Sequence, residues 1–86
     1  MKITTPKYWL EQPERFGTEM MEIETIKGQK VMIPKKLSLY WENIKMLIDA
    51  IIEDGQDPRE CLNNDTISPH VITLGEIYLE IFKEND

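Results

Sequence analysis

The chain has 86 residues, of which 41% are hydrophobic and 30% are charged. This length allows one domain with one modest core, and the composition is that of an ordinary globular chain. Sixteen acidic and ten basic residues give a net charge of −6, which argues against nucleic acid as a partner because phosphate binding needs clustered lysine and arginine. Most of the acidic residues follow residue 36, so a basic patch on a protein partner is the more natural match.

Cys61 is the only cysteine, so the chain can form neither an internal disulfide nor a cysteine-based zinc site. A single free thiol fits a reducing compartment. The sequence does not begin with the apolar run of a signal peptide, and no stretch approaches the ~18 apolar residues that a transmembrane helix needs. We therefore expect a cytoplasmic or nuclear protein that uses no membrane, metal or other cofactor.

Residues 1–19 look like an arm that precedes the domain proper at residues 20–86. Thr5 and Pro6 can begin a short helical turn, which Pro13 would end. The large apolar residues of the arm are too many for a free tail. Two interpretations stay open: they pack on the domain as a satellite cluster, or they form a docking motif for a partner. These residues are Tyr8, Trp9, Leu10 and Phe16.

Two runs of alternating polarity, residues 21–26 and 29–33, flank Lys27 and Gly28. Alternation with period two around a glycine-containing turn is typical of a half-buried β-hairpin. We expect Pro34 to close the second strand, because proline cannot donate a hydrogen bond to the ladder.

A helical period replaces the alternation from Ser38 onward, and Gly55 is expected to end the helix in the left-handed conformation. Apolar residues recur every three or four positions, so we expect one face of this helix to be buried against the hairpin. That face holds Tyr40, Ile44, Leu47, Ile48, Ile51 and Ile52.

An acidic loop at residues 56–65 follows the helix, and residues 59–62 within it are expected to form one helical turn. Its carboxylates do not have the spacing of a calcium loop. Cys61 and His70 could be pictured as a thiol dyad, but no glycine-rich elbow or oxyanion loop accompanies them. We therefore do not expect an enzyme.

Residues 66–69 look like a short third strand that proline ends. Thr73 and Glu76 have the spacing of a capping box, which would begin a second helix that extends to Phe82. The expected fold is α+β: a small three-stranded sheet, made of the hairpin and the short third strand and covered by helices.

The order of these elements and several local strings resemble Elongin C and the Skp-type adaptors, which are small members of the BTB/POZ superfamily. Residues 23–33 are similar to their first two strands, and residues 44–48 (Ile-Lys-Met-Leu-Ile) are similar to a string in their first long helix. Residues 67–71 (Ile-Ser-Pro-His-Val) resemble the string that opens their next helix. The resemblance covers residues 22–82; relative to the family, the chain stops before the C-terminal helices that complete the pocket for a substrate receptor.

The resemblance implies a non-enzymatic adaptor that binds a cullin-type ubiquitin ligase scaffold, or that competes with such adaptors. A homo-oligomerising BTB-type structural module is the alternative, in which the arm or a strand edge pairs two copies. Fold alone does not determine function, so both remain expectations. Partner contact is expected on the acidic loop and the start of the last helix, at Asp57, Arg59, Glu60, Leu62, Asn63, Asn64, Asp65, His70 and Val71.

Overall fold

The structure, a computed structural model, describes residues 5–63 and 66–82. Its elements, in chain order, are α1 (Lys7–Leu10), α2 (Pro13–Phe16), β1 (Met20–Glu24), β2 (Lys30–Pro34), a 3-10 turn η1 (Lys35–Leu37), α3 (Ser38–Glu53), α4 (Pro58–Leu62) and α5 (Pro69–Tyr78).

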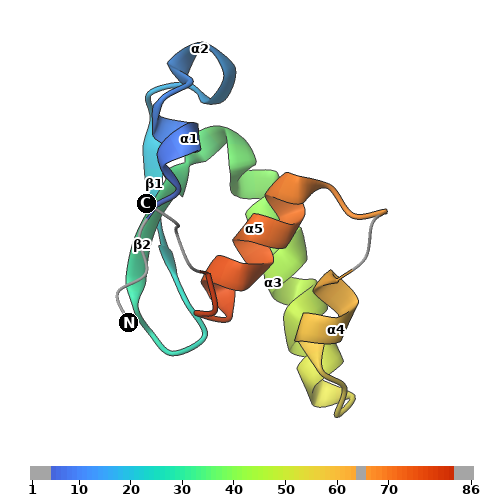
Figure 1. Ribbon diagram of the computed structural model, residues 1–86. Helices are drawn as coiled ribbons and strands as arrows, with labels where there is room; N and C mark the ends of the chain where they lie inside the picture. The colour runs from blue at the N-terminus through green and yellow to red at the C-terminus, as the bar shows by residue number, and fades with distance from the viewer. Residues whose placement is uncertain (1–4, 64–65, 83–86) are drawn as a thin grey trace.

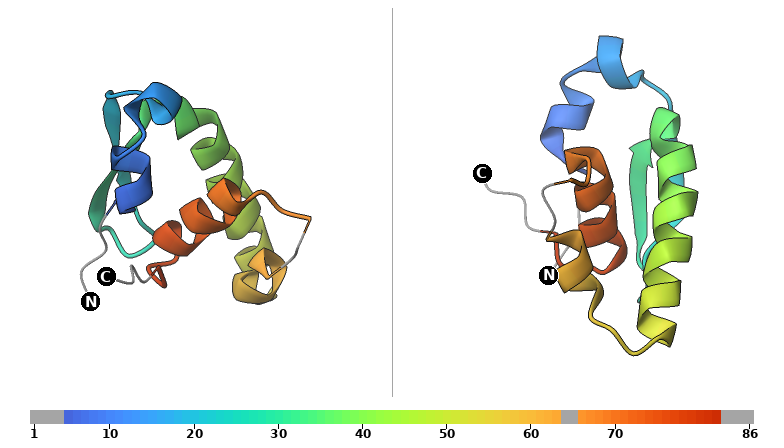
Figure 2. Two further views of the ribbon diagram at one scale, coloured as in Figure 1. Left: turned by 45° about the horizontal axis from the view of Figure 1, so that its top comes forward. Right: turned by 90° about the vertical axis from the view of Figure 1, so that its right-hand side faces the viewer.

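The hairpin of β1 and β2 stands beside two helices, α3 and α5, that cross each other (Figure 1). Helix α3 leaves β2 almost directly through η1, and α5 packs across its middle. Helices α1 and α2 lie at one end of this arrangement, and α4 lies beside the last turns of α3 at the other end (Figures 1 and 2). The core is therefore enclosed by the inner face of the hairpin, by α3 and by α5.

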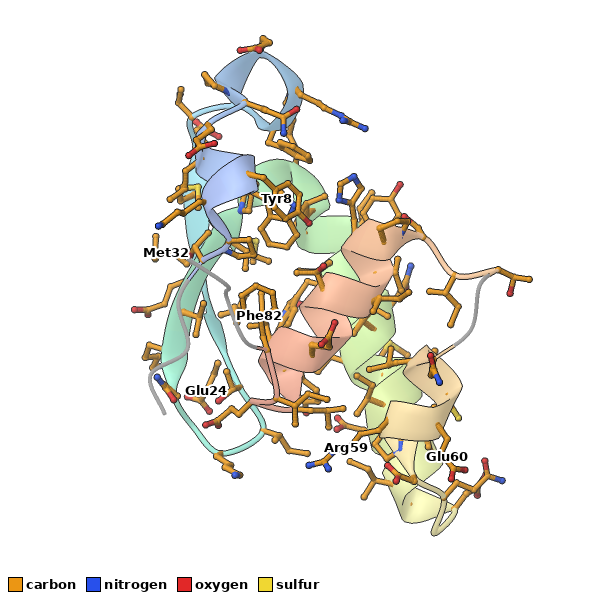
Figure 3. The ribbon with its side chains drawn as sticks, viewed as in Figure 1. Tyr8, Glu24, Met32, Arg59, Glu60 and Phe82 are labelled. Carbon is orange, nitrogen blue, oxygen red and sulfur yellow. The ribbon has the colours of Figure 1, made fainter. Side chains whose placement is uncertain are left out.

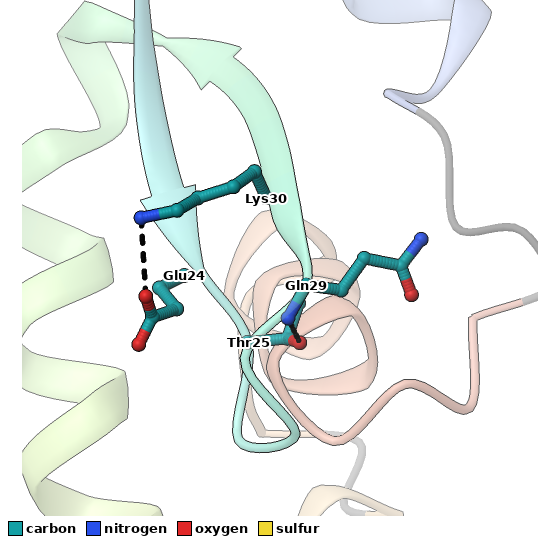
Figure 4. Close-up of polar contacts among 4 residues, drawn as sticks. All are labelled: Glu24, Thr25, Gln29 and Lys30. Atoms are coloured by element: carbon teal, nitrogen blue, oxygen red, sulfur yellow. Dashed lines mark hydrogen bonds and ion pairs between the residues drawn. The ribbon is translucent and has the colours of Figure 1, made fainter.

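The predicted alternation of the hairpin is confirmed. The strands are antiparallel, with Ile23 opposite Val31 and Met21 opposite Ile33. Ile23, Val31 and Ile33 are buried on the inner face. On the outer face the Glu24 carboxylate pairs with the Lys30 ammonium at 3.1 Å (Figure 4). This exposed pair raises the pKa of Lys30, chiefly through the hydrogen bond from its ammonium to Glu24.

The turn of the hairpin is tied to the end of α5. The amide of Gln29 donates to the Thr25 hydroxyl oxygen at 3.0 Å (Figure 4), and the Thr25 hydroxyl in turn donates to the Glu80 carboxylate. The amide of Ile26 donates to the carbonyl oxygen of Tyr78 at 2.9 Å. The Thr25 hydroxyl thus both accepts and donates a hydrogen bond, which is the condition for burying a threonine at low cost.

Glu80 takes the position that glycine usually holds after a helix. It has a φ of 61°, and the amides of Glu80 and Ile81 donate to the carbonyl oxygens of Ile77 and Glu76. These are the two hydrogen bonds of a Schellman motif. Left-handed backbone is unfavourable for a residue with a side chain. The Glu80 carboxylate offsets this cost by accepting hydrogen bonds from the hairpin turn.

Helix α3 forms where the sequence predicts it and ends in a second Schellman motif at Gly55, whose φ is 78°. The predicted buried face is wrong in part. Ile44 and Ile48 are buried as expected, but Trp41 is the third buried residue of α3, and the side chains of Tyr40 and Leu47 are half exposed. Helix α3 is apolar on more than one side, so the spacing alone is compatible with two orientations.

The predicted third strand is wrong: within the described residues the sheet consists of β1 and β2 only. Thr66 and Ile67 lie in a turn, and Pro69 begins α5. Proline suits the first position of a helix, because its fixed φ is helical and its missing N–H would have no partner there. The run that resembled a strand is therefore the approach to a helix.

The capping box at Thr73 and Glu76 is also wrong. Thr73 lies inside α5, and its hydroxyl donates to the carbonyl oxygen of Pro69 at 3.0 Å. The helix thus begins at Pro69 instead of Thr73 and ends at Tyr78 instead of Phe82.

Gly75 is the point where α5 meets α3 and α4. A Cβ atom built on Gly75 would lie 2.8 Å from a methyl group of Leu62 on α4 and 3.4 Å from the Cδ1 atom of Ile48 on α3. Glycine weakens a helix interior by about 1 kcal/mol relative to alanine, so its presence here reflects the close approach of the three helices.

The expected helical turn of the arm forms as α1, and Pro13 begins the further turn α2. Trp9 and Phe16 are buried in the same core cluster as the hairpin and α3, whereas Tyr8 and Leu10 remain exposed. Two of the four arm residues are thus core residues, which leaves Tyr8 and Leu10 accessible on the surface.

The two readings of α3 can be separated by measuring stability. Ile48 is only 1% exposed, whereas Leu47 is 51% exposed. Ile48→Ala should lower the free energy of unfolding by about 2–5 kcal/mol, because it opens a cavity between α3 and α5. Leu47→Ala should change it by less than about 0.5 kcal/mol. Urea denaturation of both variants checks this, and a larger loss from Leu47→Ala would mean that the side of α3 that holds Leu47 is buried instead.

The helix crossing can be tested with a double-mutant cycle at Gly75 and Leu62. Gly75→Ala should destabilise the protein by about 1 kcal/mol, because overpacking of about 1–3 kcal/mol exceeds a gain in helix propensity of about 1 kcal/mol. In a Leu62→Ala background the same change should instead stabilise by about 1 kcal/mol, since the obstructing methyl groups are gone. Denaturation of the four proteins gives the sign in each background. Stabilisation in both backgrounds would contradict the close approach.

Candidate functional site

A hollow of about 440 Å³ lies where α4 faces α5. Its walls come from α4, from the approach to α5, from one side of α5 and from the residue that follows its C-terminal turn. Most of the lining is aliphatic, with polar groups from Arg59, Asn63 and Glu76. The lining residues are Arg59, Leu62, Asn63, Ile67, Pro69, Ile72, Glu76 and Ile81.

The Glu76 carboxyl is the titratable group most affected by this setting. Partial burial raises the pKa of Glu76, because the apolar surroundings disfavour its charged form. An apolar hollow with one such carboxyl can receive an apolar group and accept a hydrogen bond from a polar donor attached to that group. A second group suited to proton transfer or nucleophilic attack is missing from the lining as described.

Of the residues predicted to bind a partner, Arg59, Leu62 and Asn63 line this hollow, whereas Asp57, Glu60, His70 and Val71 do not. Asp57 accepts a hydrogen bond from the amide of Arg59 at 2.9 Å and so caps α4. Arg59 and Glu60 are exposed and project from different sides of α4 (Figure 3). Leu62 is buried under Gly75, Asn63 is exposed at the rim of the hollow, and Asn64 and Asp65 lie outside the described residues.

His70 and Val71 face the arm and the core. The His70 ring stacks on Tyr8 with 6.3 Å between ring centres and meets Phe16 edge-on at 5.3 Å. Val71 packs against the core cluster. His70 and the aromatic residues of the arm therefore belong to one group of rings. Cys61 is a half-buried free thiol on α4.

A second candidate surface lies on α3, on the side turned away from the core. Leu39 is 78% exposed and Met46 is 69% exposed, and Tyr40 and Leu47 are exposed by about half. Helices α4 and α5 both lie on one side of α3, as the right-hand view of Figure 2 shows, which leaves this side uncovered by them. We call it the outer face of α3; it consists of Leu39, Tyr40, Asn43, Met46, Leu47 and Ala50.

The spacing of these residues makes the outer face one continuous stripe. Leu39, Asn43, Met46 and Ala50 are four, three and four residues apart, so they follow one line along the helix. From Leu39 to Ala50 the stripe advances by eleven steps along the helix, which is about 17 Å at 1.5 Å per residue. Single exposed apolar residues are normal, but Leu39, Tyr40, Met46 and Leu47 gather around the polar Asn43 on one side of α3. A cluster of large exposed apolar side chains is typical of an interaction surface.

An acidic row borders this stripe. Glu42, Asp49 and Glu53 are exposed, and each lies three residues after a member of the outer face, so each is its neighbour on the helix surface. The Asp49 carboxylate also accepts a hydrogen bond from the Tyr78 hydroxyl at 2.7 Å. Burial, and then this bond, raise the pKa of Tyr78 to about 12.

Sequence reasoning did not identify the outer face of α3, although a signal was present. The helix contains Leu39, Tyr40 and Trp41 in succession and then Met46, Leu47 and Ile48. Three consecutive apolar residues span most of the circumference of a helix, so they cannot all face one core. An excess of apolar residues over what one face can bury was the available sign of a second surface.

Comparisons of the chain with protein-family models, with curated proteins and with solved structures found no match. Within residues 5–63 and 66–82, no helix is long and apolar enough to cross a membrane. In the same ranges, no group of three or more His, Cys, Asp or Glu side chains could hold a metal ion. The function is therefore inferred from the surfaces of this chain.

The raised pKa of Glu76 predicts a pH-dependent gain in stability for Glu76→Gln. The folded state binds the Glu76 proton more tightly than the unfolded state, so the ionised carboxyl costs stability above the folded-state pKa and costs none below the unfolded-state value of about 4.3. Glu76→Gln should thus raise the melting temperature at pH 7, and the difference should vanish near pH 4. Thermal denaturation at both pH values measures this.

The control for this experiment is Glu42→Gln, which removes an equal charge from an exposed position on α3. It should not show the same gain at pH 7. Equal effects from the two variants, or an effect of Glu76→Gln that persists at pH 4, would contradict the burial of the Glu76 carboxyl.

Proposed function

We propose that this chain is a non-enzymatic protein-interaction module that binds its partner through the outer face of α3. The observation that carries this proposal is the exposure of Leu39, Tyr40, Met46 and Leu47 along one side of a well-formed helix. Water contact at four large apolar side chains is unfavourable, and burial on a partner removes it. A rigid helix also presents these groups with little loss of conformational freedom on binding.

The resemblance to Elongin C and the Skp-type adaptors supports the same class of function. It makes the N-terminal domain of a cullin-type scaffold the first partner to test, either as an adaptor or as a competitor of adaptors. Because the third strand of that resemblance is missing from the described residues, the proposal depends on α3 and not on the resemblance. Pairing of two copies of the chain, as in a BTB-type structural module, is the alternative.

A double variant tests the outer face directly. Leu39→Gln with Met46→Gln removes the two most exposed apolar side chains of the face and keeps good helix formers in α3. Binding should weaken at least tenfold, because central apolar side chains supply most of the energy of such contacts. Isothermal titration with cullin N-terminal domains measures hetero-binding, and sedimentation velocity measures self-association.

The matched control is Leu10→Gln with Met32→Gln. Leu10 is 54% exposed and Met32 is 44% exposed, and both lie away from α3, on α1 and on the outer side of β2. The control should bind like the wild type, and both double variants should keep the wild-type circular dichroism spectrum. Loss of binding in the control alone would move the contact to the arm or to the outer side of the hairpin. If the wild-type chain forms a stable dimer and the Leu39→Gln and Met46→Gln variant is a monomer, the outer face serves self-association instead.

A further inference from the structure

We infer that the partner of the outer face of α3 is an amphipathic helix of another protein that carries lysine or arginine along one edge. This inference rests on the proposed function and specifies the chemistry of the partner at the same face. Three features of α3 carry it: the acidic row beside the stripe, the charge of its C-terminal end, and the poor fit of the face to a second copy of itself.

The acidic row determines where the positive charges of the partner lie. Glu42, Asp49 and Glu53 follow one line along the stripe and are spaced seven and four residues apart. Their carboxylates stand at one edge of the apolar contact, where an approaching helix places its own edge residues. Asp49 is held there by the Tyr78 hydroxyl at 2.7 Å.

The C-terminal end of α3 adds to the negative potential. The last turn of a helix carries a partial negative charge and is usually matched by basic residues. The last turn of α3 contains no basic residue. Instead Glu53 and Asp54 lie there, and Asp57 follows at the cap of α4. A basic group on a partner would neutralise the negative charge at the C-terminal end of α3, because the last turn of α3 has no basic residue of its own.

The same charges disfavour a second copy as the partner. In an antiparallel two-fold pair of helices each edge faces the same edge of the other copy, so the acidic row would face an acidic row. A parallel pair would instead place the two acidic C-terminal ends of α3 side by side. Like charges at close range are unfavourable in either case. A net charge of −6 opposes association of copies further.

The spacing of the acidic row defines a peptide probe. An antiparallel helix meets the acidic row in reverse order, so its basic residues should be spaced by four and then seven residues. A synthetic peptide of about 18 residues covers the stripe of about 17 Å. It carries leucine and isoleucine on one face and three lysines with this spacing at the edge. Two further peptides serve for comparison: an isomer with the three lysines moved to the opposite polar face, and one with glutamate at the three edge positions.

Fluorescence anisotropy at 50 mM and 500 mM NaCl compares the three peptides on the wild-type chain. The edge-lysine peptide should bind about tenfold more tightly than its isomer at low salt, because three exposed ion pairs together give an effect of about this size. The advantage should shrink at high salt. The glutamate peptide should bind more weakly than both.

A variant of the chain tests the row itself. Glu42→Gln with Glu53→Gln neutralises two exposed carboxylates and leaves the Asp49 bond to Tyr78 intact. It should remove most of the advantage of the edge-lysine peptide over the isomer. Glu11→Gln with Glu14→Gln is the control, since it makes the same change in net charge at exposed positions of the arm. The control should preserve the advantage.

The outcomes separate this inference from the proposed function. If all three peptides bind with equal affinity, and the Leu39→Gln and Met46→Gln variant binds none of them, the outer face binds helices but has no preference for a basic edge. The inference would then be wrong, while the proposed function would stand. No binding of any peptide at 100 μM would overturn both. If the wild-type chain forms a dimer and the same variant does not, the outer face binds a second copy of the chain, and the inference is wrong.

Discussion

The close crossing of α3 and α5 at Gly75 is the constraint on which the rest of the structure depends. With no side chain at this position, α5 can approach both Ile48 on α3 and Leu62 on α4. The crossing determines which side of α3 is buried, because α5 packs on the side that holds Ile48. The outer face of α3 is exposed as a direct consequence.

The hairpin depends on the same helix through its turn. Where α5 ends, the carbonyl oxygen of Tyr78 and the carboxylate of Glu80 accept hydrogen bonds from Ile26, Lys27 and Thr25. A two-stranded hairpin alone is marginally stable in water. Here its turn is held by α5 and its inner face is covered by the core, so that one short helix fixes both the sheet and α3.

The two sides of α3 have different consequences for the protein. The side with Trp41, Ile44 and Ile48 supplies the core, and a domain of this size needs that burial to fold. On the opposite side, Leu39 and Met46 are exposed to water beside the acidic row. This exposure of apolar side chains adds nothing to folding and lowers solubility. Retaining both is physically reasonable if a partner with a complementary charged edge covers the second side.

Local structure could be predicted from the sequence, because it depends on neighbours along the chain. The alternation around Gly28, the end of α3 at Gly55 and the helical turn that became α4 all follow from short-range preferences. The chain alone did not distinguish Leu47 from Trp41 as a core residue, since both lie on apolar sides of α3. It also did not show that Pro69 begins a helix, although proline suits that position, or that Glu80 closes one, because the Glu80 contacts are with the distant hairpin turn. The sequence by itself thus determined the hairpin and the extent of α3, and only the packing of α5 across α3 decided which apolar side became core and which remained exposed.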